Sequence, residues 1–384
     1  MKRPKPGSYE ITAVGGERIR AFIPAPLPPV PRIVFDGELQ KRSERATLAL
    51  GRLDGVSALL PDRTLFLYSY IRKEAVLSSQ IEGTQSSLSD LLLFELDEAP
   101  GVPLDDVTEV SNYVAALEHG LTRIREGFPL SNRLVREIHG VLLSRGRGSG
   151  KQPGEFRTSQ NWIGGTRPGN ATFVPPPHTS VEKTMGDLER FLHADDDGLP
   201  TLARAGIAHV QFETIHPFLD GNGRVGRLLI TLLLCSAGVL REPLLYLSLF
   251  LKEHRSTYYD LLDTVRRDGD WEAWLSFFYA GVEETATSAV ANAHALSELF
   301  RDDRIRIEQQ GRRSGSALRV HEALKARPIS SLVAISRATG LSFPAAASAV
   351  ELLASMKIVR ELTGKRRNRL FVYDEFLRAL NDEP

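Results

Sequence analysis

Residues 205–234 constrain the fold of this chain most, because they join two apolar runs through a polar, glycine-rich turn. The first run, residues 205–215, has the composition of a buried helix. It must end at the His216-Pro217 step, since a residue that precedes proline avoids the helical region. The second run, residues 228–234, has the apolar density of another buried helix. We therefore predict two core helices whose connecting turn carries an unusual set of polar residues.

The polar residues of this turn suit the binding of a phosphate. Backbone N–H groups at the start of a helix point outwards at the positive end of its dipole. Gly221 and Gly223 let the backbone approach an anion closely, and Arg224 and Arg227 add planar, multidentate donors. A carboxylate beside an anion is unexpected unless a divalent cation lies between them. Asp220 is therefore a candidate Mg²⁺ ligand.

His216 is the one group of the turn that is suited to accept a proton near neutral pH. Each residue of the turn, taken alone, is also compatible with an ordinary connection between two core helices. Together, residues 216–227 match H-x-F-x-[D/E]-G-N-G-R-x-x-R at every fixed position. This pattern is the signature of the Fic family, so the chain resembles Fic-domain nucleotidyltransferases.

The resemblance implies a mainly α fold, a Fic-type helical bundle with a β-hairpin flap. It also implies transfer of AMP from ATP, with Mg²⁺, to a Tyr, Thr or Ser hydroxyl of a target protein, which includes the chain itself as a candidate. His216 would accept the hydroxyl proton, Asp220 would hold Mg²⁺, and Phe218 would be a buried anchor. The implied residues of the nucleotide site are Glu82, Gly221, Asn222 (through its amide as well), Gly223, Arg224, Gly226, Arg227 and Tyr258. Tyr258 and Tyr259 are both also compatible with core or rim residues, and this interpretation is favoured for Tyr259.

A second informative segment precedes the signature. A helix pattern that ends at Gly83 places Ser78 and Glu82 one turn apart on one face. On local grounds alone, Glu82 is compatible with a solvated surface residue. The spacing resembles the inhibitory [S/T]-x-x-x-E-[G/N] motif of Fic proteins. The resemblance implies that Glu82 pairs with Arg227 and removes the donor for the γ-phosphate of ATP, which leaves the α-phosphate misplaced.

Other activities are compatible with the same site. Glu82 could position a water that removes AMP from a modified protein. A phosphotransferase is disfavoured, because residues 221–224 match the adenylylating form of the signature. A non-enzymatic alternative is a DNA-binding regulator whose Fic core senses a ligand.

Residues 160–177 contain two short β-prone pieces around a Gly-, Pro- and Asn-rich centre, which predicts a hairpin. The segment is also compatible with an incidental loop. The resemblance implies that this hairpin is the flap over the active site, to which a target adds as a further strand. Thr172, Phe173 and Val174 are the candidate docking edge.

The patterns divide the chain into four parts. Residues 1–110 carry a Pro-rich extended arm, or a disordered tail, and the helices with the inhibitory motif. Residues 111–290 are the expected Fic core. Residues 291–313 belong to a long helix that starts near residue 282 and serves as a connector. Residues 314–384 form a separate unit.

The last unit shows helix patterns at residues 317–326, 332–339 and 344–356, followed by a hairpin with a basic tip. This order resembles a small winged-helix (α+β) domain. The third helix offers almost no long polar side chains for reading bases, which favours a protein-interaction or dimerisation module and a homodimer over DNA contact. The residues that would contact DNA phosphates are Lys365, Arg366, Arg367 and Arg369.

Composition excludes several classes of protein. Lys plus Arg and Asp plus Glu both number 48, so no overall charge indicates a nucleic-acid or membrane binder. The single cysteine, Cys235, lies in an apolar run and forbids an internal disulfide, which fits a reducing compartment. No apolar signal core follows the basic start, and residues 228–240 are too short to span a bilayer. We expect a cytoplasmic protein with no membrane partner.

Overall fold

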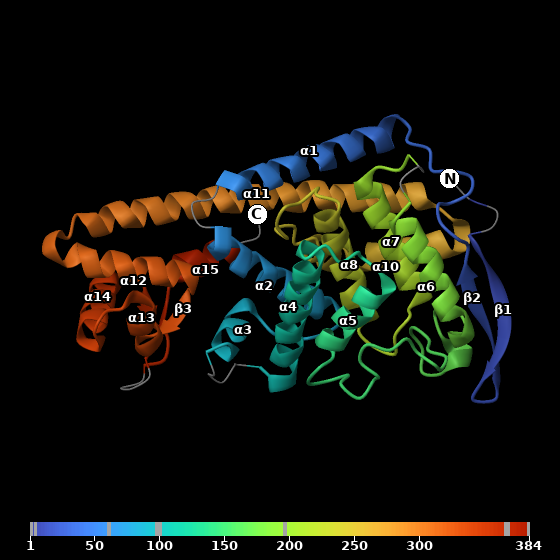
Figure 1. The fold of residues 1–384 in the computed structure, drawn as a ribbon, viewed down its shortest axis with the longest axis horizontal. Coiled ribbons are helices and arrows are strands. Elements are labelled where there is room, and N and C mark those ends of the chain that lie inside the picture. Colours follow the sequence, from blue (N-terminus) through green and yellow to red (C-terminus); the bar gives the residue numbers. More distant parts are fainter. Residues whose placement is uncertain are drawn as a thin grey trace.

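The computed structural model describes Arg3 and residues 6–59, 63–96, 102–194, 198–364 and 369–381. Its architecture is mainly helical, as the sequence predicts (Figure 1). Two long helices, α1 (Gly37–Leu59) and α11 (Trp271–Glu308), lie side by side along one side of the molecule. The helical bundle lies beneath them. Its remaining helices are α2 (Arg63–Ile81), α3 (Leu88–Phe94), α4 (Leu104–Arg125), α5 (Asn132–Leu142), α6 (His178–Leu192), α7 (Thr201–Ile215), α8 (Asn222–Ser236), α9 (Ser248–Glu253) and α10 (Arg255–Asp268).

The two core helices predicted from the apolar runs are α7 and α8, which pack against each other. Every residue of α7 from Leu202 to Ile215 is buried. The helix ends where the His-Pro step requires, with His216 in the left-handed region at φ 50°. The signature turn therefore lies between two helices that are fixed by burial.

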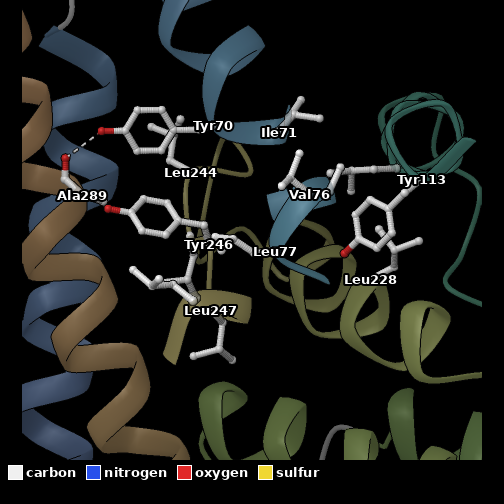
Figure 2. Close-up of a cluster of buried hydrophobic side chains, with 14 of the residues drawn as sticks. Tyr70, Ile71, Val76, Leu77, Tyr113, Leu228, Leu244, Tyr246, Leu247 and Ala289 are labelled. Atoms are coloured by element: carbon white, nitrogen blue, oxygen red, sulfur yellow. Dashed lines mark hydrogen bonds between the residues drawn. The ribbon is translucent and has the colours of Figure 1, made fainter. Parts of the chain in front are cut away.

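Helix α2 is anchored in the core from two directions (Figure 2). Tyr70 donates a hydrogen bond of 3.0 Å to the backbone oxygen of Ala289 in α11. Further along α2, Val76 lies near Tyr113 of α4 and Leu228 of α8. This packing holds the C-terminal end of α2, which carries the predicted inhibitory motif, against the start of α8.

The long helix that carries the predicted connector begins eleven residues earlier than expected, because α11 is one helix from Trp271 rather than a helix from residue 282. The Asp270 side chain caps it by accepting a hydrogen bond from the N–H of Ala273 at 3.3 Å. Buried residues at Trp274, Phe278 and Val282 follow one another at helical spacing, so no break in packing separates the two segments.

The C-terminal unit keeps the predicted order of three helices followed by paired strands, with a short strand and a final helix added. The winged-helix assignment stays a prediction, and three of its basic tip residues, within 365–368, lie outside the described residues. The hydroxyl of Tyr373 donates to Asp303 of α11 at 2.6 Å, which ties the unit to the long helix. Its elements are α12 (Ser314–Ala326), β3 (Ile329–Ser331), α13 (Leu332–Thr339), α14 (Phe343–Ser355), β4 (Arg360–Glu361), β5 (Leu370–Val372) and α15 (Asp374–Asn381), with antiparallel strand order β3-β5-β4.

Residues 7–24 of the predicted N-terminal arm are extended, and they pair with each other, which the sequence analysis did not predict. They form an antiparallel hairpin of β1 (Gly7–Val14) and β2 (Glu17–Pro24) at the end of the molecule opposite the C-terminal unit (Figure 1). The hairpin forms because residues 7–23 contain no proline and Gly15-Gly16 supply the two positive φ angles of a tight turn.

None of the described helices combines the length and apolar character needed to cross a bilayer.

Candidate active site

A cavity of about 240 Å³ opens at the N-terminus of α8, where the signature turn meets the ends of α2 and α4. The structure thus brings together residues that the sequence places far apart. The volume is below the roughly 300–1,000 Å³ of typical ligand pockets. The cavity is lined by Glu82, Thr84, Glu109, Arg147, His216, Leu219, Asp220, Gly221, Asn222, Gly223 and Arg224.

Asn222 and Phe218 hold the signature turn in shape. The Asn222 carboxamide accepts from the N–H of Phe218 and donates to its carbonyl, both at 2.8 Å. The side chain is thus engaged by the turn itself, and the contact of this amide with phosphate stays a prediction. Phe218 is fully buried, as expected of an anchor, and its ring stacks on that of His139 at 3.7 Å.

His139 of α5 is a site residue that sequence reasoning missed. Its Nδ1 accepts a hydrogen bond from the N–H of Gly154 at 2.8 Å. The hydrogen is therefore on Nε2, which donates to the backbone oxygen of Asp220 at 3.1 Å. Burial lowers the pKa of His139 to about 4, so the ring is neutral at pH 7. It positions Asp220 at the mouth of the cavity.

Arg157, also missed from the sequence, ties the signature turn to the flap. Its Nε donates to the carbonyl of His216 at 2.9 Å, and its Nη2 donates to the carbonyl of Pro176 at 2.5 Å. Its own N–H donates to the carbonyl of Pro217 at 2.9 Å. The side chain is fully buried, and this burial lowers its pKa to about 10.

Replacing Arg157 with methionine should lower the free energy of unfolding by about 3 kcal/mol or more, because buried carbonyls of the turn and flap lose their donor. Chemical denaturation followed by circular dichroism measures this. Arg133→Met is the matched control, since Arg133 is mostly exposed and its 3.1 Å pair with Glu137 should contribute less than about 1 kcal/mol. Equal stability of the two variants would show that Arg157 does not secure the turn.

His216 presents a neutral imidazole to the cavity. Its side chain is 20% exposed, and its Nδ1 is enclosed without a hydrogen-bond partner among the described residues. Nε2 is therefore the nitrogen that can face a ligand. Burial, followed by the positive charges of Arg266 and Arg157, lowers the pKa of His216 to about 3. The ring is thus uncharged at pH 7 and has one unprotonated nitrogen.

Glu82 and Arg227 are in contact, as the inhibitory motif predicts. Nη2 of Arg227 lies 2.7 Å from Oε1 of Glu82 and donates to the carbonyl of Ser78 at 2.9 Å. Nε of Arg227 donates to Oγ of Ser78 at 2.8 Å. A Cβ on Gly223 would come within 2.2 Å of Oε1 of Glu82, so the carboxylate lies directly over the N-terminus of α8.

The Glu82–Arg227 pair is ionised at neutral pH. Burial tends to raise the pKa of Glu82, but the charge and hydrogen bond of Arg227 outweigh it and lower that pKa below 4.5. The Arg227 side chain is buried, and the Glu82 side chain is 35% exposed. A carboxylate therefore occupies the anion site that the turn was predicted to provide for a phosphate.

The other signature arginine, Arg224, also has a carboxylate partner that the sequence did not reveal. Its Nη1 lies 3.1 Å from Oε2 of Glu109 in α4, and Nε of Arg147 lies 2.7 Å from the other oxygen of Glu109. Arg147 comes from the Gly-rich segment after α5, to which the sequence analysis assigned no role. The alternation of Arg and Gly in residues 145–148 was the signal that could have pointed to Arg147, whereas no sequence feature pointed to Glu109.

Gly226 and Tyr258, both predicted nucleotide contacts, do not line the cavity. A Cβ on Gly226 would come within 2.2 Å of Oε1 of Glu213, so this glycine allows α8 to pack on α7. Tyr258 is 1% exposed, and its hydroxyl is 2.8 Å from Nε2 of the buried His209. Its neighbour Tyr259 is 42% exposed. In this structure Gly226 and Tyr258 pack between helices, and their contact with a nucleotide stays a prediction.

The predicted flap is reduced to one antiparallel pair, Ile163 with Phe173, and a short 3₁₀ turn at Pro168–Asn170. The full hairpin does not form because glycines and prolines flank the pair, and proline lacks an N–H for the ladder. Of the predicted docking edge, Thr172 is exposed, whereas the carbonyl of Val174 already accepts from the N–H of Phe22 in β2 at 2.9 Å.

Asp220 has the chemistry expected of a magnesium ligand that acts together with a substrate. Its side chain is 42% exposed at the cavity, and its Oδ1 accepts from the N–H of Gly221 at 2.6 Å. Within the described part of the chain, no group of three or more His, Cys, Asp or Glu residues is arranged to hold a metal alone. A single carboxylate nevertheless fits Mg²⁺, which commonly binds one or two carboxylates together with substrate phosphates.

Comparisons with known proteins identify two domains in this chain. Residues 40–122 match the Fic/DOC family N-terminal domain, and residues 129–234 match the Fic/DOC family domain. The proteins named protein adenylyltransferase Fic from Culex quinquefasciatus and Aedes aegypti are each 31% identical over 255 residues, which is 64% of this chain and 47% of the relative. The chain thus spans about half the length of the curated relatives it matches.

Two solved structures share the fold. A Fic family protein from Desulfovibrio desulfuricans G20 superimposes with a TM-score of 0.59 at 19% identity, covering 89% of this chain and 97% of that one. A Fic domain containing signaling protein from Bacteroides thetaiotaomicron VPI-5482 gives a TM-score of 0.52 at 19% identity, covering 67% of this chain and 97% of that one. The signature, the two matched domains and the fold lead to one conclusion: residues 40–122 form a Fic/DOC family N-terminal domain and residues 129–234 form a Fic/DOC family domain.

Proposed function

We propose that this chain transfers AMP from ATP to a hydroxyl group of a protein. The observation that carries the proposal is that a neutral histidine, His216, and the N-terminus of α8 line the same cavity. The cavity therefore combines a proton acceptor with an anion site. The names of the curated relatives, protein adenylyltransferase Fic, support the same reaction.

The triphosphate of ATP binds at the start of α8. The backbone N–H groups of Asn222 and Gly223 and the guanidinium group of Arg224 supply donors for its oxygens, and Arg227 adds another donor once Glu82 is displaced. Asp220 would hold Mg²⁺, which neutralises phosphate charge when bound. Asn222 contributes by keeping the turn in the shape that points these donors at the cavity.

In the transfer step, the hydroxyl oxygen of the target attacks the α-phosphorus of ATP. The bond from that phosphorus to the bridging oxygen breaks, pyrophosphate leaves, and Nε2 of His216 takes the hydroxyl proton. AMP remains on the target as a phosphodiester. The flap aligns the hydroxyl by pairing with an extended target segment, and Thr172 is the exposed residue of its predicted edge.

The Glu82–Arg227 contact keeps this activity low. As long as Glu82 holds Arg227 and covers the N-terminus of α8, the γ-phosphate lacks its donor. ATP then binds with its α-phosphate out of line with the hydroxyl. Displacement of Glu82 is therefore the step that permits transfer.

The proposal is tested by incubating the purified Glu82→Gly variant with Mg²⁺ and ATP labelled either at the α-phosphate or at the γ-phosphate. AMP transfer to the chain itself or to proteins of an extract deposits only the α-label, and mass spectrometry shows an added AMP group. Deposition of the γ-label would indicate phosphotransfer instead. Absence of α-label from every protein, with the variant folded, would contradict the proposal.

A further inference from the structure

We propose that Glu213 is a positioning residue for His216: its carboxylate orients the imidazole and stabilises the imidazolium that forms during transfer. The inference rests on the proposed function and adds a residue that lies outside the signature. Glu213 is in the last turn of α7, three residues before His216, so the two side chains lie on the same side of the helix end.

The two side chains meet in an enclosed space. Oε2 of Glu213 lies 3.9 Å from Nδ1 of His216, and the Glu213 side chain is only 8% exposed. Neither Nδ1 of His216 nor Oε1 of Glu213 has a hydrogen-bond partner in the described structure. Buried polar atoms without partners are costly, so a shift of about 1 Å that forms an N–H···O bond between the two groups is favourable. Contacts of catalytic groups commonly tighten in this way when substrate binds.

The surrounding helices hold the Glu213 carboxylate in this place. Gly226 of α8 makes room for it, since a Cβ there would come within 2.2 Å of Oε1. Arg266 of α10 donates to the backbone carbonyl of Glu213 and to Oγ1 of Thr214, both at 3.2 Å. The end of α7 is therefore fixed on two sides, and its carboxylate has little space in which to move away from His216.

The charges around His216 explain why a carboxylate partner is needed. Arg266 and Arg157 both disfavour the protonated ring, whereas Glu82 and the backbone carbonyl of Glu213 favour it. With burial as the main cause, the pKa of His216 is about 3, which is far below the value that suits a general base at neutral pH. A nearby negative charge on Glu213 raises the basicity of the ring, as in a Ser-His-Asp triad.

The charge of Glu82 couples the ionisation of Glu213 to the inhibitory Glu82–Arg227 contact. Burial raises the pKa of Glu213 to about 7; Arg227 and Arg266 oppose this shift, and the charge of Glu82 adds to it. Displacement of Glu82 removes a negative charge and so favours ionisation of Glu213. The movement that frees Arg227 for ATP thus also prepares His216 to accept a proton.

The experiment compares Glu213→Gln and Glu213→Leu, each combined with Glu82→Gly, by following transfer of α-labelled AMP. Loss of the carboxylate should lower kcat about 10-fold for Gln, which still accepts a hydrogen bond, and about 100-fold for Leu, with the KM for ATP changed less than about 2-fold. The parent rate should rise with pH as Glu213 ionises, and this rise should be absent from both variants. Gln211→Leu is the matched control, because Gln211 is a buried polar residue of α7 that contacts Ala25 at 3.0 Å instead.

A second measurement does not depend on turnover. Nitrogen-15 spectra of histidine-labelled protein report which ring nitrogen of His216 carries the hydrogen. We expect Nδ1 in the Glu82→Gly parent and in the Gln variant, and a mixture of tautomers in the Leu variant. If the parent transfers no AMP, the proposed function fails, and the spectra still test the positioning. A Leu variant with the parent's tautomer overturns the inference, as does one with the parent's kcat and pH profile.

Discussion

Glu82→Gly should raise the initial rate of AMP transfer by about 10- to 100-fold over the unaltered chain. The estimate follows from the interaction that is removed: a hydrogen bond between charged groups contributes about 1.5–3 kcal/mol, and each 1.4 kcal/mol is a tenfold change in rate. Removing the carboxylate frees Arg227 and uncovers the N-terminus of α8, where Oε1 of Glu82 lies in the structure. Incorporation of α-labelled AMP at saturating ATP and Mg²⁺ measures the rate.

Glu126→Gly is the matched control for this prediction. Glu126 is also a glutamate just beyond the end of a helix, but its partner is Arg123 on the surface. It should leave the transfer rate unchanged. If Glu82→Gly and Glu126→Gly have the same rate as the unaltered chain, the contact with Arg227 is not inhibitory.

The same contact predicts how pH affects the inhibition. The pKa of Glu82 lies below 4.5, because Arg227 outweighs the effect of burial. Because the pKa of this carboxyl group is lowered, the contact is fully stabilising at pH values above the ordinary carboxyl pKa. Its contribution to stability is lost only as the pH falls through the lowered pKa of Glu82. The contact should therefore still inhibit at pH 6, so Glu82→Gly should activate transfer at pH 6 as well as at pH 8.

His216→Ala, made in the Glu82→Gly background, should reduce transfer by at least about 10²- to 10⁴-fold, because the hydroxyl loses its proton acceptor. ATP affinity should change little, since the phosphate donors belong to α8 and its preceding turn. Loss of label incorporation, together with an unchanged Kd for ATP from isothermal titration calorimetry, would meet both expectations.

His193→Ala controls for the loss of a histidine elsewhere in the fold, because its ring contacts the carbonyl of Leu130 at 3.0 Å, away from the cavity. This variant should transfer AMP at the parent rate. A His216→Ala protein that still transfers AMP as fast as the His193→Ala control would remove the base assignment.

Sequence reasoning succeeded where the chemistry is local. The His-Pro step and the two apolar runs predicted α7, its end and α8, because helix ends follow from nearest-neighbour constraints. The spacing of Ser78 and Glu82 predicted a shared helix face, and the resemblance named Arg227 as the partner. The N-terminal hairpin was missed because its pairing depends on a turn at Gly15-Gly16, which the sequence analysis treated as part of a proline-rich arm.

Sequence reasoning failed where a role depends on contacts between distant segments. Glu109 is 115 residues from Arg224 and lies on an ordinary helix face. Arg157 lies in a loop, yet its side chain is buried and donates hydrogen bonds to the carbonyls of Ile215 and His216, which are 58 and 59 residues further along the chain. Tyr258 and Gly226 were assigned to the nucleotide, but their burial between helices could be seen only in three dimensions.

The sequence by itself determined the reactive turn of this protein, because the conformational limits of proline and glycine and the donors of arginine act within a few residues. The tertiary structure decided which charges face that turn. Helix α2 brings Glu82 to Arg227, α4 brings Glu109 to Arg224, and the end of α7 places Glu213 behind His216. Burial and electrostatic interaction depend on distance in space rather than along the chain, so these partners become visible only once the helices are packed.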